Sequence, residues 1–219
     1  MIRSVLFDLD GTLLNTIDDL ADAGNWVCQA HGWPQHTAEE YKYFVGNGIP
    51  KLVERFSPED QRSAEQLART LEEFNARYSA HKEDRTAPYA GIAAMLQALR
   101  AQGIQMGVLS NKEDTLAQQV VEHYFPGVFQ FVRGAVAGCP TKPDPAGLYA
   151  LMDTMGADAA SSIFVGDSSV DVYTGKNGGL PVCGVLWGFR GREELLEAGA
   201  DRLITEPSQL VALVQQGQW

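Results

Sequence analysis

The chain has 219 residues, enough for one sizeable domain with a small insertion. Its formal net charge of −11 argues against nucleic acids and anionic membranes as partners, because both bind basic surfaces. Three cysteines without CxxC spacing argue against a disulfide framework or a zinc site. No apolar run approaches the roughly 18 residues of a membrane span. We therefore expect a cytoplasmic protein.

The first predicted element is a buried strand over Ser4 to Phe7, and two aspartates follow it. Asp8 and Asp10 stand directly before Gly11, where the strand pattern ends. A buried charge is costly unless it is paired or bound to a cation. A divalent cation held by oxygen ligands, with one carboxylate free to attack an electrophile, would account for both residues. The alternative is a pair of solvated aspartates that open an Asp-Gly turn.

The stretch from about Asn15 to Thr86 interrupts the alternation of strands and helices. It contains helical spacing of apolar residues but no convincing strand. Its roughly seventy residues greatly exceed an ordinary crossover. We therefore expect a helical cap over residues 16–85, inserted into a core formed by residues 1–15 and 86–219. The alternative is that these helices pack directly on the sheet.

Downstream of this stretch, strand patterns alternate with helical patterns. The predicted strands are Gln105 to Leu109, Gln130 to Val132, Ser162 to Val165, Val182 to Leu186 and Arg202 to Ile204. Helical spacing of apolar residues runs from Ile92 to Leu99 and from Leu116 to Tyr124. The alternation predicts an α/β fold, a Rossmann-like parallel sheet covered by helices on both faces.

Further polar and charged residues follow these later strands. They are Ser110 with Asn111, Lys142 in a proline-bounded loop, and Asp167 with Asp171. Because the carboxyl ends of parallel strands share one edge, where ligands bind, we expect these residues to meet the first two aspartates in one site. The carboxylates suit a metal ion, while the hydroxyl group and the lysine, the one clear cation of the core, suit an anion.

Each of these sets also has an ordinary structural alternative. Ser110 and Asn111 stand between a strand and a helix, so that they and the helix N-terminal N–H groups can face an anion, or they can simply cap the helix. Asp167 can cap a helix that begins near Val170, and Lys142 can be a solvated loop lysine. Their occurrence together favours the binding site.

The four motifs together resemble those of the haloacid dehalogenase superfamily of aspartyl-phosphate enzymes. In order, the matching segments are Asp8-Leu9-Asp10-Gly11-Thr12, Ser110-Asn111, Lys142-Pro143 and Gly166-Asp167-Ser168-Ser169-Val170-Asp171. Their order and spacing fit over nearly the whole chain. Within the superfamily, Val45-Gly46-Asn47-Gly48-Ile49-Pro50 and the segment from Asp171 to Asn177 are similar to bacterial phosphoglycolate phosphatases.

This resemblance implies a Mg²⁺-dependent phosphatase that hydrolyses a small phosphorylated metabolite, 2-phosphoglycolate, through an aspartyl phosphate. Asp8 would be the nucleophile, and Asp10 would protonate the leaving oxygen and then take a proton from water. The residues expected to hold Mg²⁺ are Asp8, Asp10 through its backbone carbonyl, and Asp167, with Asp171 in support. The residues expected to bind the phosphate are Ser110, Asn111 and Lys142.

Other activities that use similar residues stay open. A phosphomutase similar to β-phosphoglucomutase would need a phosphoenzyme that survives until a sugar hydroxyl accepts the group, and the phosphatase-like segments disfavour it. A receiver domain also phosphorylates an aspartate, but its phosphoacceptor ends a later strand and it carries no helical insertion. A haloacid dehalogenase would lack the second acid, Asp10, and a phosphonatase would need a cap lysine that this sequence does not indicate.

The cap is expected to meet a second anion on the substrate. Gly46-Asn47-Gly48 can expose backbone N–H groups, and Pro50 suits the first turn of a helix that starts there. Lys51 and Arg55, one turn apart, can add positive charge on the same face. The alternative is a turn between helices followed by two solvated cations.

Overall fold

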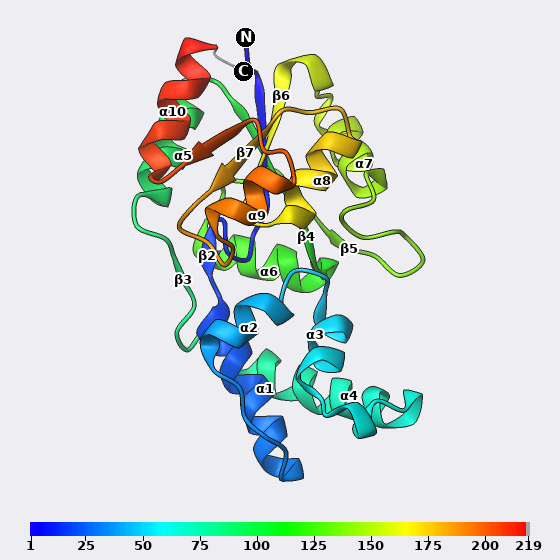
Figure 1. Cartoon of the computed structure of the whole chain (residues 1–219). Helices are drawn as coiled ribbons and strands as arrows, with labels where there is room; N and C mark the ends of the chain where they lie inside the picture. Colours follow the sequence, from blue (N-terminus) through cyan, green and yellow to red (C-terminus); the bar gives the residue numbers. More distant parts are fainter. Residues whose placement is uncertain (218–219) are drawn as a thin grey trace. The chain divides into compact units, whose positions relative to one another are not determined.

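The computed structural model describes residues 1–217 (Figure 1). The chain divides into two compact units, one formed by Met1–Leu14 with the chain from Pro88 onward, and the other by Asn15–Ala87. The first unit contains the α/β sheet and the second contains helices α1 to α4, within residues 17–81; we call them the core and the cap, and the role of the second unit as a cap stays a prediction. These divisions lie close to the expected limits at residues 15/16 and 85/86. None of the helices within residues 1–217 has the length and apolar content that crossing a membrane would need.

The core is built on a six-stranded sheet with the strand order β5-β4-β1-β6-β7-β8. Its strands are β1 (Ser4–Phe7), β4 (Gln105–Glu113), β5 (Phe131–Ala135), β6 (Ser162–Gly166), β7 (Val182–Val185) and β8 (Arg202–Ile204). Every neighbouring pair of these strands is parallel. The α/β fold class expected from the sequence is therefore confirmed.

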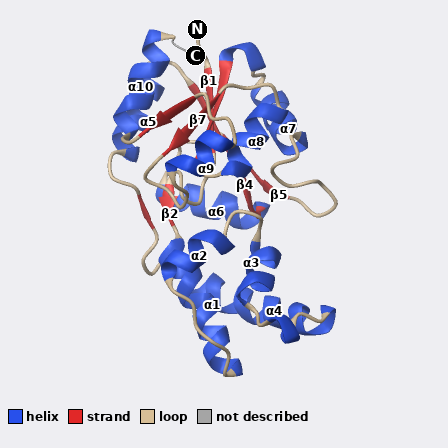
Figure 2. Ribbon diagram, in the orientation of Figure 1, coloured by secondary structure: helices blue, strands red, loops and turns tan. Residues whose placement is uncertain are grey.

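Helices cover both faces of this sheet (Figure 2). One face packs against α5 (Ile92–Ala101), α6 (Asp114–Tyr124) and α10 (Pro207–Gln216), and the other against α7 (Ala146–Met155), α8 (Ser169–Asn177) and α9 (Arg192–Glu197). Within β1, Val5 and Phe7 enter the first apolar cluster, and Leu6 enters the second. This alternation follows from the two-residue period of a strand and explains why the first strand is apolar throughout.

The cap has its own buried aromatic core. Its helices are α1 (Ile17–His31), α2 (Ala38–Phe44), α3 (Ile49–Phe56) and α4 (Ala64–His81). Tyr41, Phe56, Phe74 and Tyr78 are almost fully buried, and their successive ring centroids lie 5.7–6.2 Å apart. Gly24 of α1 allows this packing, because a Cβ at that position would collide with the Tyr41 ring. The short strands β2 (Leu14–Asn15) and β3 (Ala87–Pro88), which pair with each other, mark where the chain enters and leaves the cap.

A buried carboxylate fastens the last residues of the cap to its first helix. Asp19 of α1 is 2% exposed and accepts hydrogen bonds from the backbone N–H groups of Arg85 (2.9 Å) and Thr86 (2.8 Å) and from the Thr86 hydroxyl (2.7 Å). Hydrogen bonds to a charged group are stronger than neutral ones, and removing the acceptor would strand three buried or partly buried donors.

We expect Asp19→Ala to lower the free energy of unfolding by about 2–3 kcal/mol, because these donors lose their acceptor. Urea denaturation followed by circular dichroism measures the change. Asp22→Ala is the matched control, since the Asp22 carboxylate contacts Arg85 at an exposed position of the same helix and such pairs contribute about 0–1 kcal/mol. Equal effects of the two variants would contradict the role given to Asp19.

Candidate active site

The carboxyl ends of β1 and β6 bring three aspartates together. Asp8 directly follows β1, and its backbone N–H still donates to the Val165 carbonyl of β6 (2.9 Å). Asp167 directly follows β6, and Asp171 lies in the first turn of α8. All three are buried, and one carboxylate oxygen from each lies within 4.8 Å of the others. The sheet order changes direction at β1, which is where open α/β sheets bind ligands.

Lys142 connects two of these carboxylates. Its Nζ lies 2.5 Å from Asp8 Oδ1 and 2.6 Å from Asp171 Oδ1, with only 4% of its side chain exposed. Asn111 fixes the lysine from β4, since its amide accepts from the Lys142 N–H (2.8 Å) and donates to the Lys142 carbonyl (3.1 Å). Lys142 is therefore a buried site residue and not a solvated loop lysine.

The charges in this cluster do not balance. Burial, followed by the charge of Asp171, raises the pKa of Asp8 well above its usual range, and Lys142 only partly opposes this. The same two causes raise the pKa of Asp167 to about 7. Burial alone would lower the pKa of Lys142, but Asp171 and Asp8 raise it above its usual value. Three carboxylates around one ammonium group leave an excess of negative charge, and their hard oxygen donors fit a divalent cation.

Asp167 and Asp171 have different hydrogen-bond partners. Asp171 Oδ2 accepts from the Ser168 hydroxyl (2.6 Å) and N–H (3.1 Å), so Ser168 and Asp171 form the capping pair of α8. Asp167 instead accepts from the Phe189 N–H (2.7 Å) and the Thr12 hydroxyl (3.3 Å). The structural alternative for Asp167, capping this helix, is therefore wrong.

The structure corrects the expected end of the strand before α6. β4 runs on to Glu113, past the predicted end at Leu109, with an irregular register between these two residues. The Glu113 side chain caps α6 by accepting from the backbone N–H groups of its first turn. Ser110 and Asn111 therefore lie within the irregular strand and do not cap the helix, and their expected contact with an anion stays a prediction.

Among the described residues, the three-carboxylate cluster does not include Asp10, whose carboxylate instead contacts a second lysine that the sequence analysis missed. Lys112 Nζ lies 3.1 Å from Asp10 Oδ2, and the side chains are 3% and 14% exposed. We had expected Lys142 to be the one clear cation of the core, and this expectation was wrong, because Lys112 is a second one. The position of Lys112, directly after Ser110-Asn111 at the end of an apolar strand, was the available signal. The expected metal contact of the Asp10 backbone carbonyl stays a prediction.

The sequence model of the haloacid dehalogenase-like hydrolases matches residues 5–185. The chain belongs to this family. The expected family is thereby confirmed.

Several similar members of this family are named phosphoglycolate phosphatases. A phosphoglycolate phosphatase of Cupriavidus necator is 33% identical over 215 residues, covering 96% of this chain and 92% of its own length. A phosphoglycolate phosphatase of Pseudomonas syringae pv. syringae is 32% identical over 217 residues, covering 95% of this chain and 78% of its own length. The crystal structure of a candidate phosphoglycolate phosphatase from Lactobacillus delbrueckii subsp. bulgaricus superposes with a TM-score of 0.90 at 28% identity. The match covers 97% of this chain and 98% of that one. The expected enzyme class, a phosphoric monoester hydrolase, is confirmed.

The loop after β7 supports the family's first and fourth motifs and was also missed. Trp187 Nε1 donates to the Thr12 carbonyl (2.9 Å), and the Phe189 N–H donates to Asp167 Oδ2 (2.7 Å). Between them, a Cβ at Gly188 would collide with the Asp167 side chain and the Gly11 carbonyl. The loop therefore needs glycine at this position to pack against Asp167.

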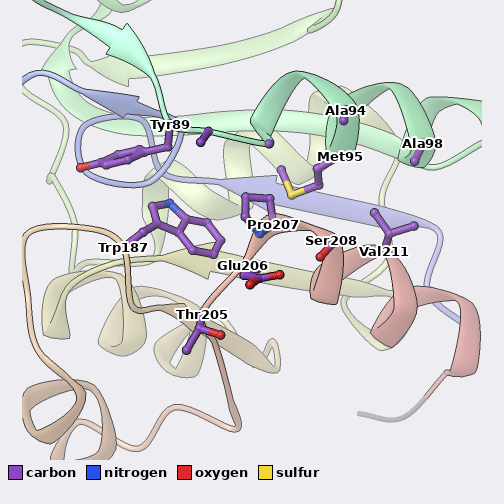
Figure 3. Close-up of a pocket in the computed structure, with 12 residues that line it drawn as sticks. Tyr89, Ala94, Met95, Ala98, Trp187, Thr205, Glu206, Pro207, Ser208 and Val211 are labelled. Carbon is purple, nitrogen blue, oxygen red and sulfur yellow. The ribbon is translucent and has the colours of Figure 1, made fainter.

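An apolar pocket of about 740 Å³ lies on the other side of this loop, between α5 and α10 (Figure 3). Trp187 and Tyr89 stand at one end of it, and Met95 and Pro207 lie farther along its walls. None of the three clustered aspartates lines it. Trp187 links the pocket to the first motif through its hydrogen bond to the Thr12 carbonyl.

The cap residues expected to set specificity already have partners within the cap. Lys51 Nζ contacts Glu54 (2.7 Å) on the surface of α3, and Arg55 donates to Asn47 Oδ1 (2.8 Å) and to the Phe44 carbonyl (2.8 Å). Arg55 thus holds the turn that contains Gly46 and Gly48, and Gly48 itself precedes α3 with a positive φ of 83°. Contact of these residues with a substrate stays a prediction.

We expect Gly188→Ala to reduce kcat/KM for p-nitrophenyl phosphate by roughly 10–100-fold, because the added methyl group must displace Asp167 or the Gly11 carbonyl, and small displacements of a site are costly. Steady-state kinetics measures this effect.

Gly191→Ala, in the same loop, is the matched control. A Cβ at Gly191 meets open space, and its φ of −85° suits any residue. Unchanged activity in Gly188→Ala, or an equal loss in both variants, would contradict the packing role of Gly188.

Proposed function

We propose that the protein is a Mg²⁺-dependent phosphatase that hydrolyses 2-phosphoglycolate through a phosphoryl group carried on Asp8. The observation that carries this proposal is the buried cluster of Asp8, Asp167 and Asp171 around Lys142 at the carboxyl edge of the sheet. The relatives named phosphoglycolate phosphatase, which align over most of the chain, support the substrate.

Mg²⁺ suits this site because it prefers hard oxygen ligands and tolerates few protein ligands. The residues that would hold it are Asp8, Asp167 and the backbone carbonyl of Asp10, with Asp171 in support. When bound, Mg²⁺ would offset the negative charge of the carboxylates and of the phosphoryl oxygens. The two glycines beside Asp167, Gly11 and Gly188, leave no room for a Cβ and so hold its carboxylate closely.

The chain's own residues account for both steps of the reaction. In the first step, an Asp8 carboxylate oxygen attacks phosphorus, the bond to the leaving oxygen breaks, and Asp10 gives that oxygen a proton. In the second step, Asp10 takes a proton from water as the water oxygen attacks the phosphoryl group, which frees Asp8 and inorganic phosphate. Lys142 would neutralise charge between Asp8 and the phosphate.

Ser110 and Asn111 would serve the phosphate in different ways. The Ser110 hydroxyl oxygen accepts the Lys112 N–H (3.1 Å), which leaves its proton available for a phosphate oxygen. Asn111 uses its amide to hold the backbone of Lys142. Asn111 would therefore act on the phosphate mainly by positioning the lysine.

Two of the alternative activities, the receiver domain and the phosphomutase, are disfavoured. A receiver domain is incompatible with membership of a hydrolase family whose sequence model covers residues 5–185. A phosphomutase is disfavoured because the similar relatives are named phosphatases.

We expect Asp8→Asn to lower kcat by about 10³-fold or more, because the amide keeps the shape of the side chain but cannot act as the nucleophile. Uncatalysed hydrolysis of phosphate monoesters is extremely slow, so background cannot hide the loss. Phosphate release from 2-phosphoglycolate measures the rate, and circular dichroism checks that the variant is folded. Activity close to that of the wild type would refute Asp8 as nucleophile.

Chelation of divalent metal should stop phosphate release, and added Mg²⁺ should restore it, because the buried carboxylates otherwise repel an anionic substrate. Asp167→Ala should raise the Mg²⁺ concentration needed for half-maximal activity by about tenfold or more, or abolish activity. Asp153→Ala, which removes an exposed carboxylate from α7, should leave the requirement unchanged. Full activity in excess chelator would contradict the metal assignment.

A further inference from the structure

The family motifs assign no role to the contact between Lys112 and Asp10. Lys112 belongs to the irregular end of β4, and its ammonium group lies 3.1 Å from Asp10 Oδ2. Its side chain is 3% exposed, so the charge is almost wholly removed from water. Burying an ammonium group is costly, and a buried ion pair is weak evidence for a purely stabilising role.

The backbones on both sides of this contact are held in place. The Lys112 N–H donates to the Ser110 hydroxyl oxygen (3.1 Å), which fixes the strand end. On the other side, Asp10 forms a β-bridge with Leu14, and the Gly11 N–H donates to the Leu14 carbonyl (2.8 Å). The remaining freedom of Asp10 is rotation of its side chain, and the lysine restrains that rotation.

The two carboxylate oxygens of Asp10 are in different situations. Oδ2 contacts Lys112, whereas Oδ1 is buried and has no hydrogen-bond partner among the described residues. A buried oxygen without a partner is costly in a resting protein, and it is suited to a reaction in which it exchanges a proton.

We propose that Lys112 is a positioning residue: its ammonium group holds Oδ2 of Asp10, so that Oδ1 is oriented to give a proton to the leaving oxygen. This inference rests on the proposed function, in which Asp10 gives that oxygen its proton as the bond to phosphorus breaks. The electron pair of the broken bond stays on the leaving oxygen and binds the proton. An alkoxide needs this proton, whereas p-nitrophenolate is a stable anion and leaves without it.

Lys112→Met tests the proposal by comparing kcat/KM on two esters, 2-phosphoglycolate and p-nitrophenyl phosphate, in saturating Mg²⁺. The loss on 2-phosphoglycolate should exceed the loss on p-nitrophenyl phosphate by about tenfold or more, since general acid catalysis contributes about 10²–10⁴-fold. Lys176→Met removes a surface lysine paired with Asp201 and should leave both values unchanged. Equal losses on the two esters, or no loss, would overturn the proposal, because a structural role does not depend on the leaving group.

Lys112→Met leaves the Asp10 carboxylate without its partner and so can prevent folding. A second comparison tests the proposal in that case. Asp10→Asn and the double variant Asp10→Asn with Lys112→Met carry no such unpaired carboxylate. If Lys112 acts through Asp10, the two should hydrolyse 2-phosphoglycolate at equal rates. A further loss of about tenfold in the double variant would overturn the proposal. A wild type that hydrolyses neither ester would instead contradict the proposed function, and this inference with it.

Discussion

The repulsion among three buried carboxylates is the constraint on which the site depends. Asp8, Asp167 and Asp171 would each be costly alone, and Lys142 neutralises only part of their charge. The remaining negative charge suits a divalent cation, which would in turn offset the repulsion between these carboxylates and an anionic phosphoryl group. The fold tolerates this arrangement because other parts of the molecule, such as the aromatic core of the cap and the two apolar faces of the sheet, supply its stability.

The sheet topology explains how residues so far apart in sequence reach one place. β1 lies between β4 and β6, and all three strands run in the same direction, so their carboxyl ends share one edge. Three of the clustered side chains, Lys142, Asp171 and Asp167, also have a neighbour that limits their movement. Asn111 holds Lys142, Ser168 holds Asp171, and the loop at Gly188 packs against Asp167. Preorganisation of this kind is what electrostatic catalysis requires.

Much of this arrangement could be predicted from the sequence. All six strands of the core were predicted, and inner strands such as β1, β6 and β7 stand out because a strand buried on both faces leaves a continuous apolar signal. The aspartates and Lys142 stand out because charges next to such runs are rare. The end of the strand before α6 was misplaced, because a strand that continues through Ser110-Asn111 with an irregular register has no apolar pattern. Lys112 stands at a strand end, which was a local signal, but its contact with Asp10, like that of Trp187 with Thr12, joins segments that lie far apart in the sequence.

The measurement that tests the central claim most directly is a rapid-mixing experiment with Asp10→Asn and p-nitrophenyl phosphate in Mg²⁺. This ester does not need protonation of its leaving group, so the first step should proceed, while the second step lacks its base. We predict a burst of p-nitrophenol equal in amount to the enzyme, with the phosphoryl group retained on Asp8 and located by peptide mass spectrometry. Steady release without a burst or a phosphorylated peptide, or a phosphoryl group on another residue, would contradict the account.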